Sequence, residues 1–452
     1  MRTLLLIIMM LTGCALRAQL PVYLDETQPL EERVNDALIR MTEAEKNELA
    51  RTCTDLRSSG VPRLGIPPFV VDTLTTPWFP SFEALAATWN PKLSKELGIG
   101  MAEQALYHRT DVVDDHAVNE MSKDAYLVSK MAPPYLEGIH QCGEAALQDW
   151  KALSVMETDS QDDLLREALK LYFKTSMNTQ RPRGFVGSET QQSLAKTVAE
   201  ESIVLLKNES LPLSKGDACL IWIVGNHPVE GLETALAHRH IQSEIRCGTL
   251  EEIYKASIGE ILVFIGNYSD CNHTDFFWRF PAILQMDDLG AEGAEALAAI
   301  LTGEVNPSGK LPCEWKGKEE KEPLFALGHG LSYTSFEFTD FQLSGREIPI
   351  GGDLIATVTV TNTGDREGYE VVQLYIHDIK SSVPKPDKEL KGFQKIWLKP
   401  GESQEVQFVI NESSLMFYDE SLQQWWAEPG FYVAFVGDAM DRLPLKARFH
   451  LK

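Results

Sequence analysis

Two short, uninterrupted apolar runs constrain the fold of this chain more than any other feature. They are Ala218–Val224 and Ile261–Ile265, and neither contains a charged residue. Strands that are apolar on both faces are typical of sheets that helices cover on both sides. Helical periodicity occurs on either side of them, over 190–206 and 291–301. The sequence therefore predicts an α/β unit over residues 187–337.

The segments before and after this unit have different periodicities. Residues 20–186 alternate helical patterns with short apolar runs, which predicts further α/β structure. Within them, Thr42 and Glu45 have the spacing of a capping box, so we expect a helix to begin there. Residues 338–452 lose the helical period, and their apolar runs alternate or lie between turn residues. This pattern is typical of an all-β sandwich of the immunoglobulin or fibronectin III type.

The first 19 residues have the pattern of an export signal. Arg2 precedes an apolar stretch, 4–11, that is too short to span a bilayer. We therefore expect residues 1–19 to be a signal peptide, and the protein to be periplasmic or secreted. The sequence Leu11-Thr-Gly-Cys14 also resembles a lipoprotein cleavage box, in which Cys14 would be lipidated and would anchor the protein to the outer membrane. The alternative is a signal cut near Ala18, with Cys14 inside the removed segment.

The composition disfavours some partners. The formal net charge of -24 makes nucleic acid an unfavourable partner, because binding the phosphate backbone needs a basic surface. A neutral partner such as a sugar is compatible with this charge. The seven cysteines lack the paired short spacings of a zinc site, and His273 between two aspartates is a weak metal pattern. We expect neither a metal nor a cofactor.

Two motifs near the end of the predicted α/β unit carry a family resemblance. They are Asn306-Pro-Ser-Gly-Lys-Leu-Pro312 and Gly328-His-Gly-Leu-Ser-Tyr-Thr-Ser-Phe336. Together with the ordered segments 61–67, 79–90, 200–209 and 358–364, they resemble glycoside hydrolase family 3. The resemblance implies a (β/α) barrel at 20–186, an α/β sandwich at 187–337 and a fibronectin III-like domain at 338–452. It also implies a β-glucosidase-like, retaining hydrolase whose partner is a carbohydrate.

The carboxyl groups for this chemistry are hard to find in the sequence. A retaining glycosidase needs two of them about 5 to 5.5 Å apart, one as nucleophile and one as acid/base. Asp149, followed by Trp150, is a candidate nucleophile, but the flanking register places it where the family has a Lys-His pair that holds sugar hydroxyls. Asp270 and Asp275 are candidates for the acid/base, and the alternative is a polar loop after a strand.

Asp72 is a candidate for sugar binding. It ends an apolar run, at the place where the resemblance implies an aspartate that holds hydroxyls of the terminal sugar. A carboxylate at the C-terminal end of a barrel strand suits this role, because sugar hydroxyls donate to it. The alternative is that Asp72 caps the following turn.

Length predicts that the barrel is shortened. A complete (β/α)8 barrel typically takes about 250 residues, whereas only 20–186 are available here. We therefore expect a partial barrel with severely reduced or absent hydrolysis. The alternative is a non-catalytic carbohydrate-binding or scaffold remnant. In the predicted β-sandwich, the strand positions of Trp397, Trp425 and Trp426 favour core packing over sugar stacking.

Overall fold

The computed structural model describes residues 20–452 except for 56–59, 69–70, 73–77, 114–116, 144, 147–148, 150–159, 225–228, 257–260, 267–276, 317–322, 349–350 and 421–422. Cys14, Asp270 and Asp275 therefore lie outside the described residues. The chain separates into two compact units. The first takes in the described residues up to Leu74, with Met101–His116 and Ile139–Val186. The second takes in Thr75–Gly100, Ala117–Gly138 and Gly187–Lys452.

Three helices form the core of the first unit. They are α2 (Leu30–Arg40), α3 (Glu43–Asp55) and α8 (Gln161–Lys174). Two 3-10 turns, η1 (Val22–Leu24) and η2 (Pro62–Leu64), complete this cluster. The buried side chains that fill it include Val34, Leu38, Leu49, Leu165, Leu169 and Phe173.

The start of α3 confirms the predicted capping box. The Thr42 amide donates to Glu45 Oε2 at 2.8 Å, and the Glu45 amide donates to Thr42 Oγ1 at 3.3 Å. Hydrogen bonds from Arg63, followed by that of the Thr42 amide, lower the pKa of Glu45 to about 2. The cap therefore keeps its charge at any mildly acidic pH.

A three-stranded parallel sheet is the described part of the barrel. Its order is β1-β2-β3, with β1 at Val71–Asp72, β2 at Val112–Val113 and β3 at Ala145–Ala146. Between these strands the chain forms α4 (Phe82–Ala87), α5 (Pro91–His108), η3 (Val118–Glu120) and α6 (Ala125–Gln141). This alternation of strand and helix confirms the expected shortened (β/α) barrel. Among the described residues, no helix is long and apolar enough to cross a membrane.

A five-stranded sheet organises the α/β part of the second unit. Its order is β4-β8-β7-β5-β6, in which β8, β7, β5 and β6 run parallel and β4 is antiparallel to β8. The strands are β4 (Val204–Asn208), β5 (Ala218–Val224), β6 (Gln242–Gly248), β7 (Ile261–Ile265) and β8 (Ala282–Met286). The accompanying helices are α9 (Glu189–Ser202), α10 (Leu232–His238), α11 (Leu250–Ala256), η4 (Phe277–Arg279), η5 (Gly290–Glu292) and α12 (Gly293–Leu301).

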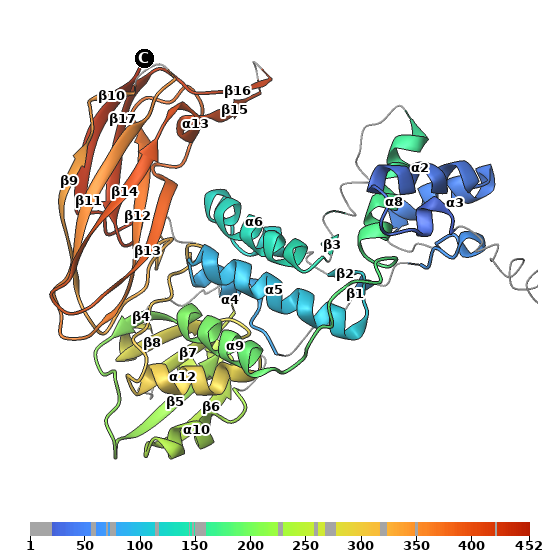
Figure 1. The fold of residues 1–452 in the computed structure, drawn as a ribbon. Coiled ribbons are helices and arrows are strands. Elements are labelled where there is room, and N and C mark those ends of the chain that lie inside the picture. Colours follow the sequence, from blue (N-terminus) through green and yellow to red (C-terminus); the bar gives the residue numbers. More distant parts are fainter. Residues whose placement is uncertain are drawn as a thin grey trace, which may run out of the picture. The chain divides into compact units, whose positions relative to one another are not determined.

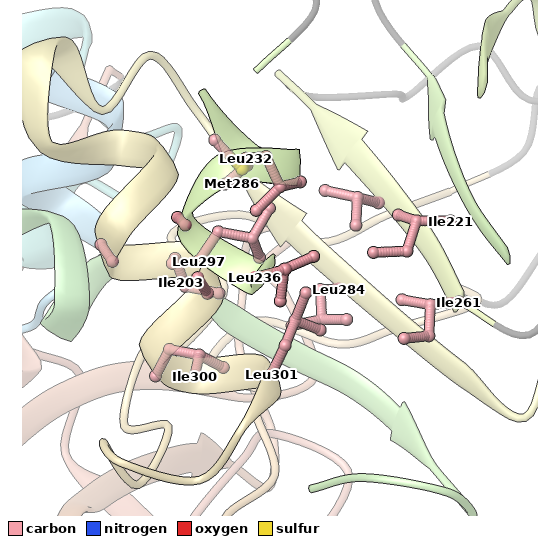
Figure 2. Packing of buried hydrophobic residues seen from close by; sticks show 14 of the residues in the cluster. Ile203, Ile221, Leu232, Leu236, Ile261, Leu284, Met286, Leu297, Ile300 and Leu301 are labelled. Atoms are coloured by element: carbon pink, nitrogen blue, oxygen red, sulfur yellow. The ribbon is translucent and has the colours of Figure 1, made fainter. Parts of the chain in front are cut away.

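Buried side chains cover both faces of this sheet, as the apolar runs predict. On one face, α10 and α12 pack against β5, β7 and β8, and Figure 2 shows Leu236 and Leu297 among the strand residues. On the other face, Trp222, Leu262 and Phe264 pack against Trp315 and further residues of the loop after α12. The sheet is therefore the middle layer of an α/β sandwich.

The expected helix over 190–206 is wrong at its C-terminal end. Helix α9 ends at Ser202, and β4 begins at Val204 and pairs with β8. The apolar residues from Ile203 onwards continue the helical spacing, but their pairing with a strand about 80 residues later decides the structure.

The C-terminal part of the second unit is a two-sheet β-sandwich, which confirms the predicted fibronectin III-like domain (Figure 1). One sheet has the order β14-β11-β9, and the other has the order β10-β18-β17-β12-β13. Strands β9 to β13 are Phe336–Leu343, Glu347–Ile348, Leu354–Asn362, Gly368–Asp378 and Glu389–Leu398. Strands β14 to β18 are Ser403–Ile410, Phe417–Asp419, Gln424–Trp426, Gly430–Gly437 and Leu445–Leu451, and the short helix α13 is Glu412–Leu415.

Two of the tryptophans expected in the sandwich core lie at the surface. Trp397 in the edge strand β13 is 42% exposed, and Trp425 in the β15–β16 hairpin is 66% exposed. In β13 the neighbours Ile396 and Leu398 take the core positions, so the alternation of side chains turns Trp397 outward.

The motif at 306–312 joins the α/β sandwich to the β-sandwich. Asn306 Oδ1 accepts hydrogen bonds from Ser332 Oγ at 2.9 Å and from the Tyr333 amide at 2.8 Å. Asn306 Nδ2 donates to the Glu367 carbonyl at 3.1 Å. The described contacts of this asparagine are thus all structural.

Helices α5 and α6 approach closely at two glycines. A Cβ atom at Gly98 would lie 2.1 Å from the Tyr135 carbonyl oxygen, and one at Gly138 would lie 2.2 Å from the Lys95 carbonyl oxygen. Backbone atoms cannot rotate away as a flexible side chain can. The glycines are therefore required by the packing of the two helices.

We expect Gly98→Ala to destabilise the protein by about 1–3 kcal/mol, because the added methyl group overpacks this crossing. Without the clash, the same change in a helix interior would stabilise by up to about 1 kcal/mol. Urea unfolding of the variant gives the sign. Gly430→Ala is the matched control, because no atom lies within 4 Å of the added Cβ. A Gly98→Ala variant at least as stable as the parent would contradict the close approach.

Candidate functional site

Two sequence candidates lie at or after strands of the three-stranded parallel sheet. Asp72 is the last residue of β1 and is in register with Val113 of β2, which is in register with Ala146 of β3. Adjacent strands are about 4.8 Å apart, so the ends of β1 and β3 are separated by about 10 Å. In (β/α) barrels the C-terminal edge of the sheet carries the functional groups.

Asp149 follows the end of β3 at the same edge. Its Oδ2 atom lies 2.7 Å from His140 Nε2, and the two side chains are 32% and 47% exposed. This contact orients the carboxylate. The arrangement is that of a polar, partly exposed pair that can accept hydrogen bonds from a ligand hydroxyl. The other candidates, Asp270 and Asp275, lie outside the described residues.

A buried carboxyl group that sequence analysis missed lies at the end of another parallel strand. Asp287 directly follows β8, is 8% exposed, and accepts a hydrogen bond from Gln285 Nε2 at 2.8 Å. Burial, with smaller contributions from the charges of Glu83 and Asp288, raises the pKa of Asp287 to about 6. A pair of aspartates immediately after an apolar strand is the signal that could have indicated it.

Asp287 lines a cavity of about 180 Å³ in the second unit. Gln285 Oε1 is buried beside it and has no hydrogen-bond partner. Other residues of the lining are Glu83, Glu120, Ser122, Lys123, Cys313 and Trp315. The cavity has room for one small molecule or a few waters, since a water occupies about 30 Å³ of the liquid.

Asp287 gives this cavity a group that can exchange a proton near neutral pH. A carboxyl group with a pKa of about 6 can hold a proton in mildly acidic solution and release it just above, as a general acid does. Among the described residues, no group of three or more His, Cys, Asp or Glu side chains converges to hold a metal ion.

Comparisons with known proteins agree with this architecture. Residues 250–333 match the model of the glycosyl hydrolase family 3 C-terminal domain, and residues 370–440 match that of the fibronectin type III-like domain. The solved structure of β-glucosidase 3B from Thermotoga neapolitana superposes with a TM-score of 0.74 at 19% identity. That match covers 92% of this chain and 99% of the other.

Curated relatives match over different lengths. The β-glucosidase BoGH3A of Bacteroides ovatus is 25% identical over 704 residues, covering 93% of this chain and 94% of the relative. The alignment is longer than the 452-residue chain, so the relative has segments without a counterpart here. The periplasmic β-glucosidase of Salmonella typhimurium is 37% identical over 187 residues, which are 34% of this chain and only 24% of that protein.

A shortened (β/α) barrel, an α/β sandwich and a fibronectin III-like domain follow one another in this order, and the fold is similar to that of the solved β-glucosidase 3B. The chain is thus similar to glycoside hydrolase family 3 and is β-glucosidase-like.

Proposed function

We propose that this protein binds carbohydrate of the β-glucoside type and that its hydrolysis of the glycosidic bond is severely reduced or absent. The observation that carries the proposal is the shortened barrel, whose described part has three parallel strands, β1 to β3, whereas a complete barrel has eight. Retaining hydrolysis needs two carboxyl groups about 5 to 5.5 Å apart, and a shortened barrel has fewer strand ends on which to place them. The long alignment with BoGH3A supports the same conclusion, because the relative has segments that this chain lacks.

The chemistry explains why the loss would be severe. In a retaining mechanism one carboxylate bonds to the anomeric carbon while the other carboxyl group protonates the departing oxygen. Loss of either group removes a covalent or proton-transfer step that binding alone does not replace. What remains is recognition, since the carboxylates of Asp72 and Asp149 can accept hydrogen bonds from sugar hydroxyls.

The test is turnover of p-nitrophenyl β-D-glucoside by the purified full chain. We expect kcat/KM at least about a hundredfold below that of the Salmonella typhimurium relative measured in parallel. The control Asp162→Asn, which removes an exposed carboxylate of α8, should leave any residual turnover unchanged. Turnover comparable with the relative and abolished by Asp149→Asn would overturn the proposal. A second measurement is glucose binding. Binding that Asp72→Asn weakens would indicate a carbohydrate-binding protein, and absence of binding would indicate a scaffold.

A further inference from the structure

The second unit has a larger cavity away from every strand end discussed above. Its volume is about 650 Å³, which lies within the range of about 300–1,000 Å³ typical of small-molecule sites. Three parts of the unit line this open cavity: the C-terminal turns of α9, the loop after α12, and the start of β12 with the residues before it and the outer face of β13. The lining includes Glu200, Glu201, Glu304, Arg366, Glu367, Tyr369 and Trp397.

Trp397 gives this cavity an aromatic wall. It is paired across the strands with Tyr369 of β12, and the two rings meet edge to face with centroids 4.6 Å apart. Trp397 is nevertheless 42% exposed. Burying a large apolar side chain typically contributes about 1.5–3 kcal/mol, and this indole ring gains only part of that. A flat apolar surface therefore remains available to a ligand.

The carboxylates around the ring have most of their charge compensated. Glu201 Oε2 pairs with Lys395 Nζ at 2.8 Å, Glu304 Oε2 pairs with Arg239 Nη2 at 2.9 Å, and Glu200 Oε1 lies 3.7 Å from Lys196 Nζ. Each carboxylate has about four acceptor positions, so these contacts leave some of them unused. The wall is thus rich in acceptors without a strong net charge, which suits neutral hydroxyl donors better than phosphates or organic cations.

The wall is also held in place before any ligand binds. Lys395 Nζ, which fixes Glu201, donates in addition to the Thr88 carbonyl at 2.8 Å. Arg366 Nη1 donates to the Gly303 carbonyl at 3.3 Å and its guanidinium lies over the Tyr333 ring. Binding to a wall of this kind loses little side-chain entropy.

We propose that this cavity is a binding site for a neutral oligosaccharide, in which one sugar ring stacks on Trp397 and its hydroxyls donate to Glu200 and Glu367. Sugar rings combine an apolar face of C–H groups with hydroxyl donors at the rim, and the cavity offers the complement of both. Burial of Glu200, which raises its pKa, leaves a carboxylate that gains from new donors. The site goes beyond the proposed function, because it needs neither Asp72 nor Asp149 and breaks no bond.

Calorimetric titration of the full chain with cellotetraose tests the site. Trp397→Ala should weaken binding at least about tenfold, because it removes the stacking surface, and Trp397→Phe should restore part of the affinity. Trp425→Ala is the matched control: it removes an exposed tryptophan of the same β-sandwich that does not line the cavity, and it should bind like the parent. Thermal unfolding of each variant establishes that it is folded.

The outcomes distinguish this cavity from the proposed sugar site at Asp72 and Asp149, which we call the strand-edge site. Unchanged affinity in Trp397→Ala, absence of cellotetraose binding, or binding of spermidine in place of the sugar would each overturn the proposal. If Asp72→Asn abolishes binding and Trp397→Ala does not, the strand-edge proposal stands and this one fails. The reverse result supports the cavity and counts against sugar binding by Asp72.

Discussion

Replacing Asp287 with asparagine should stabilise the protein by about 3 kcal/mol at pH 8 and change its stability little at pH 4. The side chain is buried, and its pKa of about 6 in the folded protein lies above the ordinary value of 3.8. Each unit of pKa difference corresponds to about 1.4 kcal/mol. The neutral asparagine keeps an oxygen for Gln285 Nε2 and brings an N–H donor next to the unpartnered Gln285 Oε1.

The pH window follows from the raised pKa. Below pH 3.8 the carboxyl group is protonated in both the folded and the unfolded chain, so the folded state carries no penalty. Between pH 3.8 and 6 the unfolded chain releases its proton first, and stability falls. Above pH 6 the loss is complete and constant. Asp287→Asn should remove this loss.

Urea unfolding at pH 4, 6 and 8 measures the effect, with Asp288→Asn as the control. Asp288 is the adjacent aspartate but is exposed, so its replacement should change the free energy of unfolding by less than about 0.5 kcal/mol. Equal stabilisation by Asp287→Asn at pH 4 and pH 8 would mean that the carboxyl group does not titrate as described.

Replacing Lys310 with methionine should destabilise the protein by about 3–5 kcal/mol, because it leaves a buried carboxylate without its partner. Lys310 Nζ lies 2.7 Å from Glu370 Oε1, and the two side chains are only 4% and 5% exposed. The Lys310 ammonium also donates to the Gly330 carbonyl at 2.9 Å. Replacing both partners, in Lys310→Met/Glu370→Leu, should recover most of the loss, because no unpaired charge then remains.

An exposed pair provides the matched comparison. Lys255 Nζ and Glu251 Oε1 are also 2.7 Å apart, but the side chains are 69% and 73% exposed. Lys255→Met should therefore cost less than about 1 kcal/mol in the same urea measurement. A similar cost for the buried and the exposed pair would refute the role of burial.

The strands of the α/β sandwich could be predicted because burial on both faces leaves a continuous apolar run. The limits of β5 and β7 coincide with those runs. The end of α9 could not be predicted, since residues 203–206 fit a helix locally and become β4 only through pairing with β8. The local sequence pattern thus predicted β5 and β7 correctly, but it failed at residues 203–206, where pairing with a distant strand determines the structure.

The site residues were predicted unevenly for a related reason. Asp72 ends β1 and Asp149 comes three residues after β3, so a local apolar run was enough to locate both near strand ends. The burial of Asp287 depends on segments far away in the sequence, around Glu83 and Ser122, which enclose its cavity. The expectation that Trp397 packs in the core was wrong, because Ile396 and Leu398 on either side of it occupy the core face of β13.

The contacts of Asn306 also show which parts of the chain the 306–312 motif links. The 306–312 motif holds the α/β sandwich against the β-sandwich, through hydrogen bonds and a buried charge pair that involve no barrel strand. These contacts between the two sandwiches therefore do not depend on the number of barrel strands. The motif that makes the chain recognisable belongs to its scaffold, whereas any reaction would depend on other residues.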